Sequence, residues 1–240
     1  IDYPVIDDTA NDAAITSEAA AISATDMTFG NKQLSAYNHT SLVKVSMQLL
    51  QDNAFDLNAF LIEALGERIA RSTNAKFTTG TGSGQSECVI TGASLGNTAG
   101  SASAIVAGDI LDLVHSMDVS YRRNAKFMAH DNVISAIRQL GLGSSNDFPI
   151  FIPGMGAGEN DKLFGYDVVY NNDMESSIAT GNKTLLFGNF NKYVVRNAGG
   201  VQLMRLNERF ADSMEVGFLV SKRVDAKVLN SAAIKYLQQA

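Results

Sequence analysis

The chain has 240 residues, of which 45% are hydrophobic, and it carries a formal net charge of −6. This length supports one large domain or two interleaved ones, and the acidic balance argues against a dedicated nucleic-acid binder, which would normally carry a basic stripe. The single cysteine, Cys88, excludes an internal disulfide and a cysteine-based zinc site, and the longest apolar runs are too short to span a membrane.

The first fifty residues combine a weakly hydrophobic segment with a strand. Residues 7–26 are small, polar and acidic, so they are interpreted either as a frayed terminus or as an arm that orders on a neighbouring subunit. Further along, apolar and polar residues alternate, which predicts a strand; its apolar positions are Val43, Val45, Met47 and Leu49. With residues 27–40, which alternate weakly, this strand predicts a long exposed hairpin.

Three helices follow from periodicity. Residues 52–74 predict one long helix of about 18 residues, begun by Asp52, Asn53 or Asp56, because apolar residues recur every four positions at Leu57, Leu61, Leu65 and Ile69. Residues 108–117 predict a shorter helix whose inner face is Ile110, Leu111, Val114 and Met117. Residues 130–141 predict another, capped by Asp131 or His130 and ended by Gly141, whose inner face is Val133, Ile134, Ile137 and Leu140.

The remaining elements are strands and loops. Strands are predicted at residues 88–90, 125–129, 166–170, 184–187, 193–196, 201–206 and 215–224. The phrase "NAGG", residues 197–200, predicts a tight hairpin between two of these strands because its glycines suit positive φ. Residues 141–162 are expected to form a long loop. The overall fold class is therefore α+β.

No pattern supports catalysis strongly. "GASLG" places Ser94 where a hydrolase nucleophile would stand, but that motif needs a helix immediately after it, and "NTAGSASA" is poor helix material. "GTGSGQ", residues 80–85, lacks both the third glycine of a dinucleotide loop and the Lys-Ser/Thr ending of a nucleotide loop. His39, His115 and His130 lack metal-ligand spacing. We expect no catalytic residue, metal or cofactor, and a serine hydrolase remains the weakest alternative.

Five phrases in order resemble the major capsid proteins of tailed bacteriophages that share the HK97 fold. They are "VSMQLLQDNAFDLNAFLIEALGERIAR", "FTTGTGSGQ", "AKFMAHDNVISAIRQL", "LFGYDVVYNNDM" and "LLFGNFNKYVVRNAGGVQLMR". The resemblance runs from about Phe29 to the C-terminus. It implies an N-terminal arm (1–14), an extended loop (15–48), a peripheral domain (49–95 and 190–226) and an axial domain (96–189 and 227–240).

The resemblance also implies a function and partners. Such a protein is a structural subunit, not an enzyme, and forms hexamers and pentamers that close into an icosahedral virion shell around non-specifically packaged double-stranded DNA in the host bacterial cytoplasm. A scaffolding segment, a protease, a portal and decoration proteins are further possible partners. Many members lose an N-terminal scaffolding segment to a protease, which Ile1 would suit. The alternative within the fold is an encapsulin-like nanocompartment that carries enzyme cargo.

The residues expected at contacts between subunits fall into two groups. The extended loop contributes Phe29, Lys32, Leu34 and Tyr37, because an isolated two-stranded hairpin cannot cover its own apolar surface. The turn of the peripheral domain contributes Asn197, Gly199 and Gly200, which the resemblance places near contacts between three capsomers.

Overall fold

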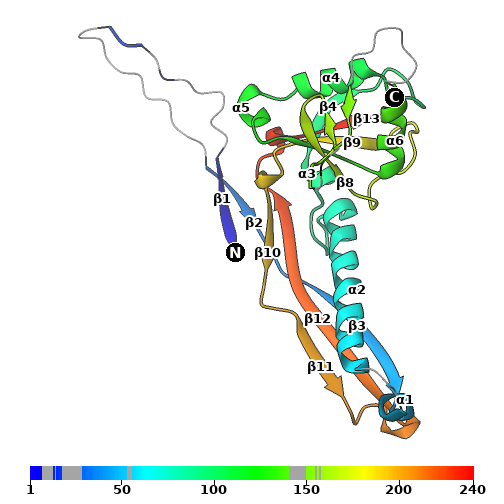
Figure 1. Ribbon diagram of the computed structural model, residues 1–240. Helices are drawn as coiled ribbons and strands as arrows, with labels where there is room; N and C mark the ends of the chain where they lie inside the picture. Colours follow the sequence, from blue (N-terminus) through cyan, green and yellow to red (C-terminus); the bar gives the residue numbers. More distant parts are fainter. Residues whose placement is uncertain are drawn as a thin grey trace.

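The computed structural model describes residues 1–6, 13, 15–17, 29–52, 56–140, 150–154, 156 and 158–240. Figure 1 shows three parts, which we name the ribbon, the blade and the head. The ribbon consists of strands β1 (Asp2–Ile6) and β2 (Phe29–Gln33). The blade is a four-stranded sheet with helix α2 along it, and the head is a seven-stranded sheet with short helices. The mixture of helix and sheet confirms the predicted fold class.

Strand β12 (Glu215–Val228) is the centre of the blade. Strand β3 (Tyr37–Ser46) pairs antiparallel with its first ten residues on one edge. On the other edge, β11 (Gln202–Leu206) and β10 (Tyr193–Asn197) lie one after the other along β12. Both edges of β12 are therefore occupied along most of its length.

Helix α2 (Leu57–Thr79) packs on one face of this sheet. Its leucines recur every four residues and contact apolar side chains of β3 and β12; the cluster contains Leu57, Leu61, Leu65, Ile69, Val45, Val216, Phe218 and Val220. The side chain of Asp56 accepts a hydrogen bond from the amide of Ala59 (3.1 Å) and begins the helix, which confirms one of the three predicted caps. At 23 residues, or about 35 Å, the helix is longer than expected.

Two predictions for the blade are wrong. The strand predicted to reach Leu49 ends at Ser46, because the Ser46 hydroxyl accepts a hydrogen bond from the amide of Leu49 (3.2 Å) and turns the chain into helix α1 (Met47–Asp52). The partner predicted for that strand is also wrong. β2 pairs with β1, and β3 pairs with β12, so the two strands either side of residues 34–36 do not form a hairpin with each other.

The hairpin predicted at "NAGG" is wrong as well. β10 and β11 run in the same direction along the same edge of β12, so residues 198–201 carry the chain forward and do not reverse it. The amide of Ala198 donates to the carbonyl of Arg223 (2.9 Å), and Gly199 has a φ of +88°. The prediction of a glycine with positive φ is therefore correct, but these residues form an irregular break between two collinear strands.

The head sheet has the strand order β4-β13-β9-β5-β8-β7-β6. Its strands are β4 (Ser94–Thr98), β5 (Lys126–Ala129), β6 (Phe151–Ile152), β7 (Lys162–Leu163), β8 (Tyr166–Tyr170), β9 (Lys183–Gly188) and β13 (Ile234–Gln238). The main core lies between this sheet and helices α4 (Ala107–His115) and α6 (Asp131–Leu140), with the rings of Phe127 and Phe187 4.6 Å apart at its centre. A smaller core on the other face includes Leu186 and Val228, the last residue of β12.

Several details of the head differ from the predictions. Residues 88–90 were predicted as a strand, but Val89–Gly92 form helix α3, which Cys88 caps. On α4, Leu111 is 41% exposed and Leu113 is fully buried, so the inner face includes Leu113 in place of Leu111. The amide of Asn132 donates to His130 (3.0 Å), which makes His130 the cap of α6, while Gly141 lies outside the described residues. Strands β4, β6, β7 and β13 and the short helix α5 (Val119–Arg122) were not predicted.

The packing of α2 predicts how strongly the blade depends on single leucines. Leu65 is 1% exposed and lies within the α2–sheet cluster, so Leu65→Ala should lower the free energy of unfolding by about 2–5 kcal/mol. The matched control, Ile62→Ala on the same helix, removes a side chain that is 52% exposed and should cost less than about 1 kcal/mol. Urea unfolding of the unassembled subunit measures both; equal losses would contradict this packing.

Candidate assembly surfaces

Polar contacts fix the junction between the ribbon and the blade. The nitrogen of Ile1 donates to the carbonyl of Leu34 (3.0 Å), and the amide of Leu34 donates back to Ile1 (2.9 Å), which closes the base of the ribbon. The Arg196 guanidinium, from β10, donates to the carbonyls of Leu34 (2.6 Å) and Ser35 (2.8 Å). From β12, the Asp225 carboxylate accepts from the amide of Ser35 (2.5 Å).

We name Lys32, Arg196 and Asp225 the junction clamp. The Lys32 ammonium adds a third contact by donating to the carbonyl of Val228 at the end of β12 (2.6 Å). Asp225 is 1% exposed, and its other oxygen accepts from the amide of Ala226 (2.8 Å). Losing the Ser35 amide would therefore leave one buried carboxylate oxygen without its partner. The clamp therefore sets the direction in which the ribbon leaves the blade. No sequence motif marks Asp225; the only signal is an acidic residue inside a mostly apolar and basic strand.

The structure separates the predicted assembly residues into exposed and enclosed ones. Phe29 is 69% exposed on the ribbon, whereas Leu34 is only 2% exposed. The expectation that Leu34 adds to an exposed apolar surface is therefore wrong, because the junction encloses it. Tyr37 and Asn197 lie on either side of Val224 in one row across the blade, which brings the two predicted groups together. Whether any of these residues touches a neighbouring subunit stays a prediction.

Exposed apolar side chains gather on the blade face that points away from α2. Leu42, Leu219 and Met204 stand in one register row across β3, β12 and β11. Their neighbours Val43 and Phe218 pack towards α2, so alternation turns this row to the other face. Leu42 is 40% exposed and Met204 56% exposed. Such a row on an otherwise polar surface is typical of an interaction site.

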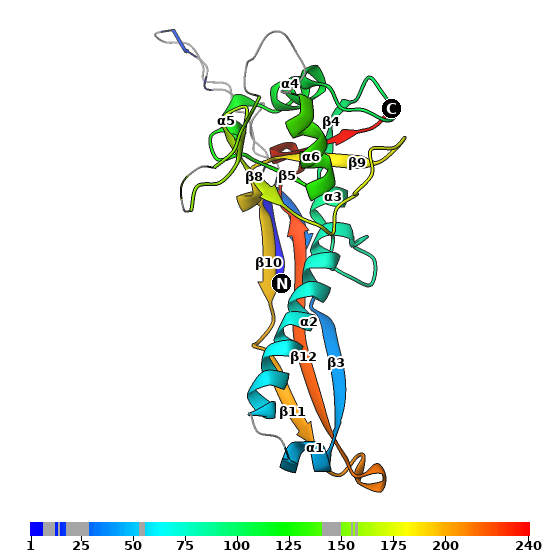
Figure 2. The same cartoon turned by 45° about the vertical axis from the view of Figure 1, so that its right-hand side comes forward.

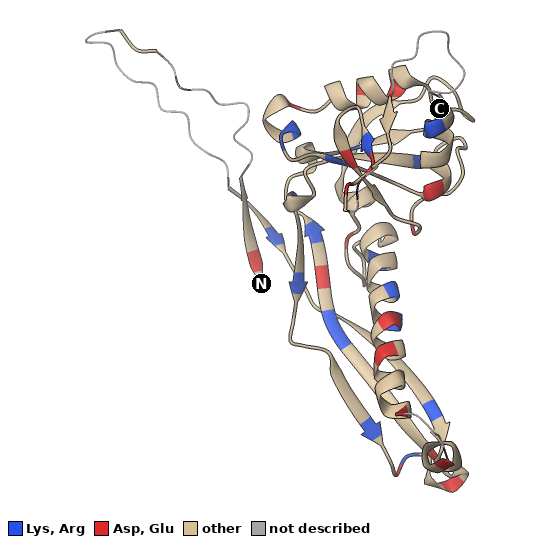
Figure 3. Cartoon of the chain, in the orientation of Figure 1, with Lys and Arg blue, Asp and Glu red and all other residues tan. Residues whose placement is uncertain are grey.

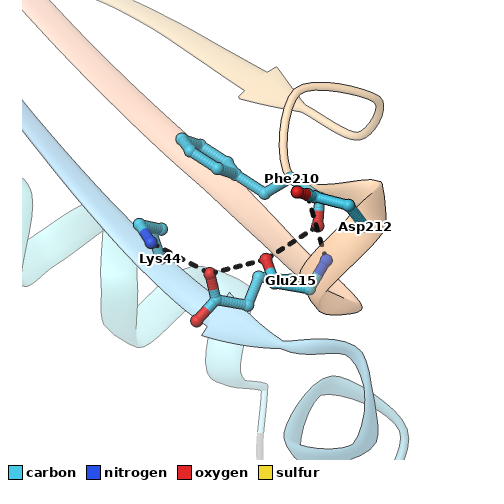
Figure 4. A network of polar contacts seen from close by, with 5 residues as sticks. Lys44, Phe210, Asp212 and Glu215 are labelled. Carbon is cyan, nitrogen blue, oxygen red and sulfur yellow. Dashed lines mark hydrogen bonds and ion pairs between the residues drawn. The ribbon is translucent and has the colours of Figure 1, made fainter.

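The far end of the blade is organised by a polar network. Figure 4 shows Glu215 between Lys44 of β3 and the loop before β12. The Glu215 carboxylate accepts from the Lys44 ammonium (3.1 Å) and the Ser213 hydroxyl (3.1 Å), and Lys44 also lies 4.9 Å from the centre of the Phe210 ring. The hydrogen bond from Lys44, then that from Ser213, lowers the pKa of Glu215. The network presents the exposed Met214 at the tip of the blade.

The enzyme-like patterns do not assemble into a site. Ser94 begins strand β4, no helix follows it directly, and its hydroxyl donates to the carbonyl of Ser231 (2.8 Å). His39 contacts the Ser72 hydroxyl (3.0 Å), and burial, then Lys76 and Lys222, lowers its pKa. Within the described ranges, no group of three acidic, histidine or cysteine residues could hold a metal. None of the described helices is long and apolar enough to cross a membrane.

Comparison with known proteins identifies the family of the chain. Residues 1–239 match the phage capsid family. The chain belongs to the phage capsid family. It is therefore a major capsid protein, a structural subunit of a shell. No curated protein sequence matches it significantly.

Solved capsid structures share this HK97-like fold. The capsid of a native gene transfer agent (GTA) particle is 26% identical, covers 100% of this chain and 85% of that one, and superimposes with a TM-score of 0.84. The capsid structure of Microbacterium phage Oxtober96 is 18% identical with a TM-score of 0.72, at 100% and 86% coverage. The holo-SrpI encapsulin complex of Synechococcus elongatus is 17% identical, covers 88% and 77%, and has a TM-score of 0.63.

In this capsid protein, the clamp predicts a local effect on the ribbon. Arg196→Ala removes two charge-assisted hydrogen bonds and should raise hydrogen exchange in residues 29–36 about tenfold or more, since such a bond contributes about 1.5–3 kcal/mol. The exposed Arg223→Ala, from the neighbouring strand, should leave that exchange unchanged. Mass spectrometry of the unassembled subunit measures it. Equal exchange in both variants would mean that the clamp does not hold the junction.

The tip network predicts an acid-sensitive loop. The folded structure lowers the pKa of Glu215. Its carboxylate therefore stabilises the loop fully above the pKa of an unfolded glutamate, about 4.3, and this stabilisation is lost as the pH falls through the folded pKa. Amides of residues 207–215 should therefore lose protection, relative to intrinsic exchange, as the pH falls below about 4. Glu215→Gln should remove this pH dependence while the rest of the blade is unchanged. A Glu215→Gln loop with the same acid response as the native loop would refute this.

Proposed function

We propose that copies of this major capsid protein form hexamers and pentamers, which close into an icosahedral shell around double-stranded DNA inside a host bacterial cell. Family membership supports the shell. The observation that carries the proposal is the ribbon, whose described residues are nearly all exposed. Its described hydrogen bonds to the rest of the chain lie near its base, at Ile1 and Lys32. An isolated two-stranded ribbon is only marginally stable in water, and exposed apolar side chains usually mark an interface. Cover by a neighbouring copy would supply the missing contacts.

The charge distribution is compatible with DNA as the content. The four blade strands contain six Lys or Arg residues and two acidic ones, although the whole chain has a net charge of −6. Figure 3 shows blue bands on each of these strands. A strongly basic lining would bind DNA tightly, because binding releases counterions, and packaged DNA must later leave the shell. A chain that is acidic overall avoids such tight binding. The proposed role is structural, without catalysis. A scaffolding segment, a protease, a portal and decoration proteins are proposed as partners of assembly.

The alternative is a nanocompartment shell that encloses protein cargo, and the similarity to a solved encapsulin favours it as second candidate. The two functions share the fold and differ in content. Particles formed together with a DNA-packaging machinery should be purified, treated with nuclease and then opened. They should release double-stranded DNA that the shell protected from the nuclease. Shells that carry a protein cargo and no protected DNA under those conditions would favour the nanocompartment.

The exposed ribbon predicts a variant that folds but does not assemble. Phe29 is 69% exposed, so Phe29→Asp should leave the melting temperature of the unassembled subunit within about 2 °C. Because a charge replaces an apolar contact with the next copy, shell yield should fall about tenfold or more. Phe29→Leu keeps the apolar surface and should assemble normally. Electron microscopy counts the shells, and normal yields from Phe29→Asp would refute the ribbon contact.

A further inference from the structure

We propose that neighbouring copies in the shell are joined by strand addition, in which β2 of one copy's ribbon pairs with β3 of the next copy's blade. This inference rests on the proposed shell and names the two backbone edges that meet. The proposal follows from the backbone groups of β2 and β3 that have no partner among the described residues of their own subunit. The proposed occupant of each open edge is a second copy of this chain.

The outer edge of β3 is open over four residues. The amide of Met47 donates to the carbonyl of Met214 (2.9 Å), immediately beyond the pair Ser46 and Glu215. Because hydrogen-bonded and non-hydrogen-bonded pairs alternate in an antiparallel ladder, odd-numbered residues of β3 direct their backbone groups to β12. Even-numbered residues direct theirs outwards, and all five are exposed. Ser46 ends the strand and turns the chain into α1, which leaves Asn38, Thr40, Leu42 and Lys44 as the open positions.

A second contact confirms this alternation. The carbonyl of Arg223, which stands opposite Asn38, accepts from the amide of Ala198 on the other edge of β12. Arg223 therefore points its backbone groups away from Asn38, as a non-hydrogen-bonded pair requires. In the described part of the chain, no other strand pairs with this outer edge.

The two edges of the ribbon are not equivalent. Ile1 and Leu34 exchange hydrogen bonds in both directions, so even-numbered residues of β2 face β1, and odd-numbered ones face outwards. The outward residues of β2 are Phe29, Asn31 and Gln33. On β1 the outward residues include Pro4, which has no amide hydrogen to donate in the middle of that edge. Only β2 therefore offers an uninterrupted edge.

The arrangement of the two open edges favours a contact between copies. In Figure 1 the ribbon leaves the blade on the β10 side, whereas β3 lies on the opposite side of β12. A ribbon on one side and its acceptor on the other make a head-to-tail contact, which closes into rings when the rotation between copies is right. The lengths also match, since β2 has five residues and the open part of β3 spans seven.

Proline substitution tests the two edges without breaking the subunit's own ladders. Thr40→Pro and Asn31→Pro each remove an outward amide hydrogen, and Asn31 stands opposite Pro4 at a non-hydrogen-bonded position. Each variant should raise the critical concentration for shell assembly at least about fivefold, the factor that one hydrogen bond typically contributes to association. Thr40→Val and Asn31→Val keep the amide and should assemble at the native concentration. Normal assembly of both proline variants would overturn the proposal.

Cysteine pairs test the contact independently of subunit stability. Asn31→Cys is combined in turn with cysteine at Asn38, Thr40, Leu42 or Lys44, and the shells are oxidised. The native Cys88 is buried and does not interfere. Strand addition predicts multimers linked at one or two adjacent positions of the four, because paired residues lie about 4.5–5.5 Å apart. Shells in which none of the four pairs links would overturn the edge contact alone, whereas native protein that forms no shell would contradict the proposed function itself.

Discussion

The structure depends on one strand, β12, whose two edges and one face are all occupied by the same chain. β3 holds one edge, β10 and β11 share the other, and the leucines of α2 cover one face. The last residue, Val228, reaches the smaller core of the head beside Leu186. Blade and head are therefore joined by a continuous strand with long-range pairing. This gives a long subunit a rigid axis, which a shell needs if contacts at both ends are to be made at defined angles.

The junction clamp follows from where the pairing of β12 stops. β3 begins at Tyr37, opposite Val224, so the residues before it have no strand partner on β12. Backbone groups that leave a ladder still need partners when they are buried. The Asp225 carboxylate takes the amide of Ser35, and Arg196 supplies donors to two carbonyls. Side chains thus replace the missing strand, and the ribbon leaves the blade in a fixed direction although its outer part has little contact with its own subunit.

Local patterns predicted the long helix and most of the longer strands, but not the short strands, and the pairing partners of the strands depended on distant residues. The four-residue spacing of Leu57, Leu61 and Leu65 was sufficient to place α2 and its inner face, because helical periodicity is a local property. In contrast, "NAGG" is compatible both with a hairpin and with the interruption observed. The interruption forms because β12 is long enough to pair with β10 and β11 one after the other. The glycines of "GASLG" illustrate the same limit. A Cβ at Gly92 would lie 2.5 Å from Val228, and one at Gly96 would lie 2.5 Å from Leu113, so close packing explains a motif that resembles a catalytic loop.

A subunit that must associate has to keep open strand edges, and open edges also invite aggregation. This chain limits the risk by making its edges unequal. Pro4 interrupts the outer edge of β1, and the exposed Lys44 places a charge on the open edge of β3. The remaining complementary edges lie on opposite sides of the blade, and the clamp holds one of them at a fixed angle. Random stacking of flat edges is disfavoured under these constraints, whereas a repeated rotation from copy to copy satisfies both edges. A ring, and from rings a closed shell, is then the association that leaves the fewest backbone groups without partners.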